Sequence, residues 1–168
     1  MVIVVGGAHS GIGKTALICD LIQGLDGVCA VKCSVSDHHN GVQIIVSKNS
    51  LQEKGKDTRR FFDAGAKRVI MVQAKREDLG KIAPALERAI QRMVKRCRNV
   101  IVEGNSITQY IRPDLVIYLY DKKAGERTEG SIITERMADI TLQAFNYDIQ
   151  AVMDEIERFE NHTYKDVT

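Results

Sequence analysis

The chain has 168 residues, of which 44% are apolar, and 24 basic against 22 acidic side chains leave a net charge of +2. This length predicts a single domain over residues 1–168, and the balanced charge gives no reason to expect nucleic acid or an anionic membrane surface as a partner. Because no apolar run approaches the ~20 residues of a membrane span and no signal peptide is recognisable, we expect a cytoplasmic protein.

Short apolar runs alternate with amphipathic stretches along the chain. In chain order we predict a strand at 2–6, a helix at 14–24, a strand at 28–33, a short helix at 57–64, a strand at 68–73, a helix at 79–97, strands at 99–103 and 115–120, and helices at 131–145 and 148–159. Pro84 should bend the helix at 79–97 or mark a later start of it.

The order of these elements predicts an α/β fold with a doubly wound, mainly parallel sheet between two helical layers. Most of the predicted strands are nearly continuous apolar runs, as strands covered on both faces require. Ligands of such sheets bind outside the carboxyl ends of the strands. The segments to search for function are therefore the loops at 8–15, 34–57 and 104–113.

The loop at 8–15 follows the first strand and reads Ala-His-Ser-Gly-Ile-Gly-Lys-Thr. It matches the phosphate-binding P-loop pattern G-x-x-x-x-G-K-[ST] except at its first position, where Ala8 permits the tight turn if its φ stays negative. Lys14 is expected to reach the outer phosphates and Thr15 to ligate Mg²⁺. The residues predicted to hold GTP or ATP are Ser10, Gly11, Ile12, Gly13, Lys14, Thr15, Ala16 and, further along the chain, Lys56.

A magnesium site also needs an acidic group at the carboxyl end of a neighbouring strand. Glu103 ends the apolar strand at 99–103 and is the best-placed candidate, with Asp121 at the end of the strand at 115–120 as the alternative. The metal ligands are thus predicted to be Thr15 and Glu103, and the groups acting on the phosphates Lys14, Glu103 and Asp57. Asp57 could orient water or metal, or merely cap a short helix.

The four cysteines, Cys19, Cys29, Cys33 and Cys97, include no C-x-x-C pair. Their spacing indicates neither a zinc ribbon nor a redox pair, so they are predicted to be small apolar residues in a domain that needs no disulfide.

Several segments together resemble the MobB family, the molybdopterin-guanine dinucleotide biosynthesis adaptors. These segments are the P-loop, the strand end with Lys32, the run Gly-Lys-Asp-Thr followed by Ala-Gly-Ala within 55–66, and Glu103-Gly104. The resemblance spans about residues 1–120, and the segment 55–66 is its most specific part. The loop with His38 and His39 and the continuation after Gly104 depart from the family pattern, as in a divergent branch.

The resemblance implies a P-loop protein that binds GTP, hydrolyses it weakly, forms a homodimer and works beside the nucleotidyltransferase that attaches GMP to molybdopterin. The residues alone do not indicate guanine. The run that follows the strand at 115–120, Asp-Lys-Lys-Ala, has no Asp at the fourth place of the guanine-reading pattern Asn-Lys-x-Asp. GTP over ATP therefore rests on the resemblance.

Two other functions remain open at this point. A small-molecule kinase would need a basic lid over the phosphates, and the glycine-containing segment 122–127 could serve as one. A metal-delivery GTPase could use His38 and His39 with Cys33 or Asp37, since imidazole and thiolate bind transition metals.

Overall fold

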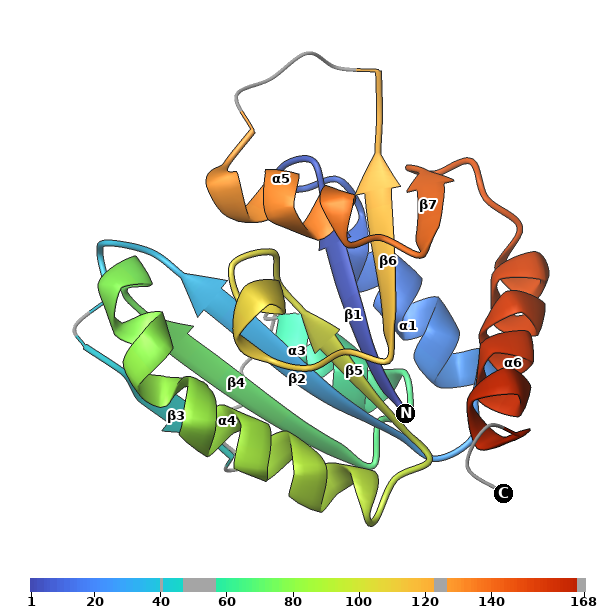
Figure 1. Ribbon diagram of the computed structural model, residues 1–168, viewed down its shortest axis with the longest axis horizontal. Coiled ribbons are helices and arrows are strands. Elements are labelled where there is room, and N and C mark those ends of the chain that lie inside the picture. Colours follow the sequence, from blue (N-terminus) through green and yellow to red (C-terminus); the bar gives the residue numbers. More distant parts are fainter. Residues whose placement is uncertain (40, 47–56, 123–126, 166–168) are drawn as a thin grey trace.

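The computed structural model describes residues 1–39, 41–46, 57–122 and 127–165, with side chains through residue 161. Within these residues one sheet contains seven strands, in the order β3-β4-β2-β5-β1-β6-β7 (Figure 1). The strands are β1 (Val2–Gly7), β2 (Val28–Val35), β3 (Gln43–Ile45), β4 (Arg68–Ala74), β5 (Asn99–Glu103), β6 (Leu115–Tyr120) and β7 (Ile140–Gln143). All neighbours pair in parallel except β3 and β4. The predicted α/β class with a mainly parallel sheet is confirmed.

Helices cover both faces of this sheet. They are α1 (Lys14–Gly24), α3 (Asp57–Asp63), α4 (Leu79–Val94), α5 (Glu129–Arg136) and α6 (Ile149–Lys165), with 3₁₀ turns η1 (Arg76–Asp78) and η2 (Thr108–Tyr110). Successive residues of β1 point to opposite faces of the sheet and pack against the helices on either side, as the two-residue period of a strand requires. Ile3 and Val5 pack in one apolar core with α1, α3 and α6, and Val2 and Val4 pack in another with α4. None of the described helices is long and apolar enough to cross a membrane.

Three predicted elements need correction. The helix predicted at 131–145 is instead α5 followed by the separate strand β7, because the alternating Ile-Thr-Leu-Gln run pairs with β6. Within the predicted loop 34–57, residues 43–45 form the antiparallel edge strand β3. Helix α4 begins at Leu79 and runs through Pro84, so Pro84 does not mark a later start; it lies in the second turn, where the residue four positions before it is Gly80.

The cysteines also differ from the prediction. Cys29 in β2 and Cys97 after α4 form a disulfide with their Cα atoms 6.0 Å apart, while Cys19 and Cys33 are free thiols. Cys29 and Cys97 are 68 residues apart, and no sequence motif pairs cysteines at that separation. Only the fold brings the start of β2 beside the end of α4.

The sheet order determines where functional side chains meet. Strand β1 lies between β5 and β6, so the loop that follows it is flanked by the carboxyl ends of both neighbours. Glu103 ends β5, and Asp121 follows β6. The loop at 8–15 therefore lies at the edge where a doubly wound sheet binds its ligands.

Candidate functional site: a P-loop with an ionic cluster

The P-loop connects β1 to α1 with its backbone open to an anion. Gly13 is the N-cap of α1 at φ 102°, no side chain caps the helix, and the first turn has no acidic residue. The first N–H groups of a helix lack partners within the helix and carry the positive end of its dipole, so such an uncapped start favours a phosphate. Gly11 also has a positive φ of 79°, whereas Ala8 does not, so Ala8 satisfies the condition under which it can replace the first glycine.

Some side chains of the P-loop are buried and anchor it, whereas others are exposed at its tip. Ile12 is buried, and its Cγ2 lies only 2.6 Å from the position that a β-carbon on Gly7 would take, so it pins the loop to the end of β1. Ser10 and Gly11 are exposed at the tip. Lys14 folds over the loop and donates to the carbonyl oxygen of His9 at 3.2 Å.

Burial lowers the pKa of Lys14, and the nearby charge of Lys32 lowers it further, although Glu103 and Asp57 act in the opposite direction. Among the described residues Lys14 takes part in no ion pair. Its ammonium is therefore a positive charge next to the P-loop that no carboxylate of the described residues pairs with directly.

An ionic cluster lies beside the start of α1. The hydroxyl of Thr15 donates to the two carboxylate oxygens of Glu103 at 3.2 and 3.3 Å, although the two residues are 88 positions apart. The Lys32 ammonium donates to Asp57 at 2.6 Å and to Glu103 at 3.0 and 3.1 Å. Four side chains from β2, α3, α1 and β5 thus converge on one point.

Lys32 was not among the predicted site residues. It lies in β2 with only 17% of its side chain exposed. Burial acts most strongly on its pKa and lowers it, but attraction to Glu103 and the hydrogen bonds to Asp57 and Glu103 outweigh burial, so the pKa is raised. The signal was available in the sequence, because a lysine within an apolar strand needs a buried counter-charge.

The predicted ligands Thr15 and Glu103 fit a magnesium ion. Their oxygens face each other next to the uncapped helix start, and hydroxyl and carboxylate oxygens are the groups that Mg²⁺ prefers. Asp121, the alternative ligand, lies instead beside His9, whose Nε2 is 2.9 Å from its carboxylate. Lys56, which we predicted to contact phosphate, lies outside the described residues.

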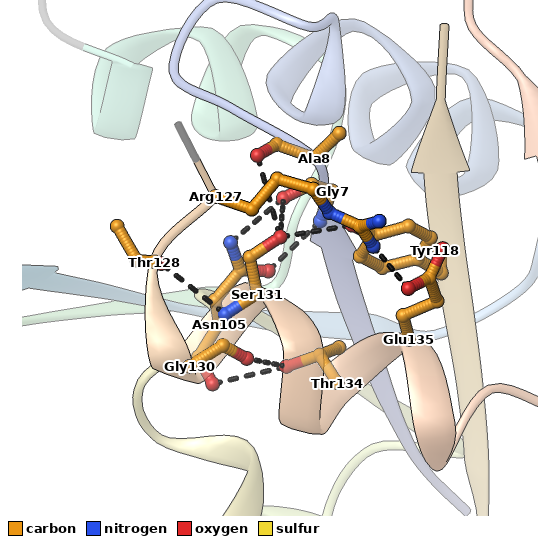
Figure 2. Close-up of polar contacts among 10 residues, drawn as sticks. All are labelled: Gly7, Ala8, Asn105, Tyr118, Arg127, Thr128, Gly130, Ser131, Thr134 and Glu135. Atoms are coloured by element: carbon orange, nitrogen blue, oxygen red, sulfur yellow. Dashed lines mark hydrogen bonds and ion pairs between the residues drawn. The ribbon is translucent and has the colours of Figure 1, made fainter. Parts of the chain in front are cut away.

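A polar network fixes the start of the P-loop from the other face of the sheet (Figure 2). Asn105 accepts from the Gly7 N–H and donates to the Gly7 carbonyl oxygen, both at 2.8 Å. Ser131 in α5 donates to the carbonyl oxygens of Gly7 and Ala8 and shares a 2.8 Å hydrogen bond with Tyr118. The network brings the start of α5 against the loop, so buried and half-buried partners hold the shape of the loop.

The described residues give little support to the two alternative functions, a kinase with a lid and a metal-delivery GTPase. Most of the predicted lid, residues 123–126, lies outside them, and Arg127 is turned to Glu135 and to the Tyr118 hydroxyl. No group of three or more His, Cys, Asp or Glu side chains in the described part of the chain could hold a metal ion. Burial raises the pKa of Cys33 to about 12, which disfavours the thiolate that a metal would need.

A comparison with known protein families identifies the family of this chain. The sequence profile described as Molybdopterin guanine dinucleotide synthesis protein B, MobB, matches residues 1–134. The chain belongs to the MobB family. The resemblance inferred from the P-loop and the segment 55–66 is thereby confirmed, and family membership supports a P-loop nucleotide-binding protein.

A solved structure supports the fold of this MobB family member. LpxK from Aquifex aeolicus, whose crystal structure was determined in complex with ATP, superposes with a TM-score of 0.50 and 18% identity over 86% of this chain and 48% of that chain. At this identity the likeness shows the fold alone, and the present chain spans about half the length of LpxK. No curated protein matches the sequence.

Proposed function

We propose that this protein binds GTP with Mg²⁺ at the P-loop, hydrolyses it slowly, and assists the synthesis of molybdopterin guanine dinucleotide. The single observation that carries the proposal is the meeting of Thr15 and Glu103 beside an uncapped helix start. Family membership supports the pathway, and the preference for GTP is our inference from the same family likeness. By the same reasoning we propose one domain, a homodimer in the cytoplasm and a nucleotidyltransferase as partner.

The chain's own groups would bind the triphosphate by position and charge. The N–H groups of the P-loop and the first turn of α1 point at the phosphate oxygens, and Lys14 leaves the His9 carbonyl to contact the outer phosphates. Thr15 and Glu103 would hold Mg²⁺, which supplies positive charge for the phosphate oxygens. Lys32 then holds Glu103 and Asp57 in place on the opposite side of the cluster.

The way in which the two carboxylates are engaged supports the proposal of slow hydrolysis. Glu103 accepts hydrogen bonds from Thr15 and Lys32, and Asp57 accepts one from Lys32. A general base must be free to take a proton from the attacking water. With both carboxylates paired to the same ammonium, the proton transfer that speeds hydrolysis is disfavoured until another protein changes the cluster.

The test is calorimetric titration of GTP, ATP and inorganic tripolyphosphate, each with and without Mg²⁺. We expect all three to bind in the presence of Mg²⁺, with GTP the tightest. Lys14→Ala should weaken the binding of all three by about tenfold to a hundredfold, since it removes charge-assisted hydrogen bonds to phosphate, while the melting temperature stays within a few degrees. Lys81→Ala is the matched control, because Lys81 is exposed on α4 and should change nothing.

Two further variants test the metal ligands. Thr15→Val and Glu103→Gln should remove most of the gain in affinity that Mg²⁺ gives, while leaving the weaker binding without Mg²⁺ in place. Unchanged affinity in Lys14→Ala, or unchanged dependence on Mg²⁺ in both ligand variants, would contradict the assignment of the site. Sedimentation velocity tests the homodimer, and co-purification with the GMP-transferring enzyme tests the partner.

A further inference from the structure

Phe145, just after the end of β7, has an unusual combination of exposure and backbone geometry. The residue is 76% exposed, the largest exposure among the large apolar residues that the structure describes. Its φ of 57° makes it the one non-glycine residue with a positive φ in the described part of the chain. A bulky side chain in this region is strained, and such strain concentrates at functional sites. Glycine or asparagine would form the same turn more readily.

The ring of Phe145 lies against the P-loop. Its Cε1 and Cζ atoms are 3.0 Å from the position that a β-carbon on Gly13 would take. Hydrogen bonds on either side hold the turn, from the Ala144 N–H to the Tyr120 carbonyl oxygen at 2.7 Å and from the Asn146 N–H to the Gln143 carbonyl oxygen at 3.1 Å. An exposed aromatic ring is thus fixed next to Gly13, the N-cap of α1.

The ionic cluster shows which way a bound nucleotide would run. Thr15, Glu103 and Lys32 mark the end where the metal and the outer phosphates belong, and they lie on the β5 and β2 side of β1. The phosphate chain must therefore leave the P-loop toward the opposite side, where β6 and β7 end. Figure 1 places the end of β7 on that side of β1. Phe145 is the aromatic side chain that follows β7.

We propose that Phe145 is the platform on which the purine base of the bound nucleoside triphosphate stacks. The inference rests on the proposed nucleotide site and adds to it the residue that holds the base. Phe145 lies beyond residues 1–134, the part of the chain that the family profile matches. An aromatic ring stacks on any base through its π face, so this contact adds affinity for guanine and adenine alike.

The chain contains no tryptophan, which makes a direct probe available. Phe145→Trp places a single indole at the platform, and its fluorescence should be quenched and shifted by GTP and by ATP but not by inorganic tripolyphosphate. Ile44→Trp is the matched control, since Ile44 is an exposed apolar residue on β3, the opposite edge strand of the sheet. A response to GTP that is equal in the two variants, or equal for GTP and tripolyphosphate at Phe145→Trp, would overturn the proposal.

Binding measurements separate this inference from the proposed function. Phe145→Ala should weaken GTP and ATP by about tenfold or more and leave tripolyphosphate unchanged, because only the base loses its contact. Phe145→Tyr should bind as the parent protein does. If the parent protein binds none of the three ligands, the proposed function fails; if it binds all three and Phe145→Ala changes none of them, only the platform is refuted.

Phe145→Gly adds a readout that a structural role would not give. Glycine relieves the strained φ, so the melting temperature should stay level or rise while GTP affinity falls as in Phe145→Ala. If Phe145→Gly instead lowers the melting temperature and weakens tripolyphosphate as well, the ring shapes the P-loop and does not hold the base.

Discussion

Removal of the Lys32 ammonium tests the ionic cluster most directly. Lys32→Met keeps most of the length of the side chain but leaves Glu103 and Asp57 without their shared cation. The side chain of Glu103 is only 7% exposed, and breaking a buried pair by removing one partner costs about 3–5 kcal/mol. Asp57 is 39% exposed, so water replaces its partner at a cost of less than about 1 kcal/mol.

Glu103 keeps its hydrogen bond from Thr15 in this variant, which places the expected loss near the lower limit, at about 3 kcal/mol. For a chain of this size that corresponds to a melting temperature lowered by about 6–12 °C. The measurement is urea unfolding of the ligand-free protein at pH 7, followed by circular dichroism. The raised pKa of Lys32 means that its contribution is fully present below about pH 10.4, the value for an unfolded lysine, and is lost as the pH rises through the folded value.

Two controls decide whether the loss comes from the buried carboxylate. Lys81→Met removes an exposed ion pair with Asp78, in which the lysine side chain is 76% exposed, and should cost far less stability than Lys32→Met because water screens the pair. Lys32→Met combined with Glu103→Gln should recover about 1–3 kcal/mol relative to Lys32→Met alone, because the neutral amide no longer needs a cation. A loss no larger than that of Lys81→Met, or a double variant as unstable as the sum of the single ones, would refute the reasoning.

Three other expectations follow from the same geometry. Gly13→Ala should abolish nucleotide binding, because the positive φ of this position strains any β-carbon and the ring of Phe145 would have to move away; calorimetry with GTP checks it. Asn105→Ala removes two hydrogen bonds to Gly7 and should lower stability by about 1–3 kcal/mol in urea unfolding. Cys33, with its pKa raised to about 12, should be alkylated at pH 8 up to about a thousandfold more slowly in the native than in the unfolded protein, and mass spectrometry measures the two rates. The contribution of the protonated Cys33 thiol to stability is fully present below about pH 8.5, the value for an unfolded cysteine. It is lost as the pH rises toward 12.

The P-loop and Glu103 could be predicted from the sequence because their signals are local. A strand, a glycine-rich turn and a helix follow one another at 2–24, and Glu103 ends a buried apolar run. Parallel strands in a doubly wound sheet bring such strand ends to one edge, so their convergence follows from the fold class. The predicted position of Asp57 at the start of a helix also agrees with the structure, where it begins α3.

The missed features depend on contacts that are distant in sequence. Strands β3 and β7 have three and four residues, too few for periodicity to separate them from loops or helix ends. Phe145 reads as one more apolar residue of a helix until β7 is recognised, and only then does its place after a strand end become visible. The disulfide between Cys29 and Cys97 depends on where α4 ends relative to β2, which no spacing rule encodes.

Lys32 and Lys14 have different roles in the site because Lys32 is paired with carboxylates and Lys14 is not. Lys32 already has two carboxylate partners, so its pKa is raised and its removal should reduce stability. Burial lowers the pKa of Lys14, which has a carbonyl partner and no ion pair among the described residues, so the ligand-free protein holds a desolvated cation at some cost to stability. A phosphate chain at the P-loop supplies the anion that Lys14 lacks. A preformed phosphate site therefore requires two results. Replacing Lys14 should weaken ligand binding without lowering the stability of the protein, and replacing Lys32 should lower the stability of the ligand-free protein.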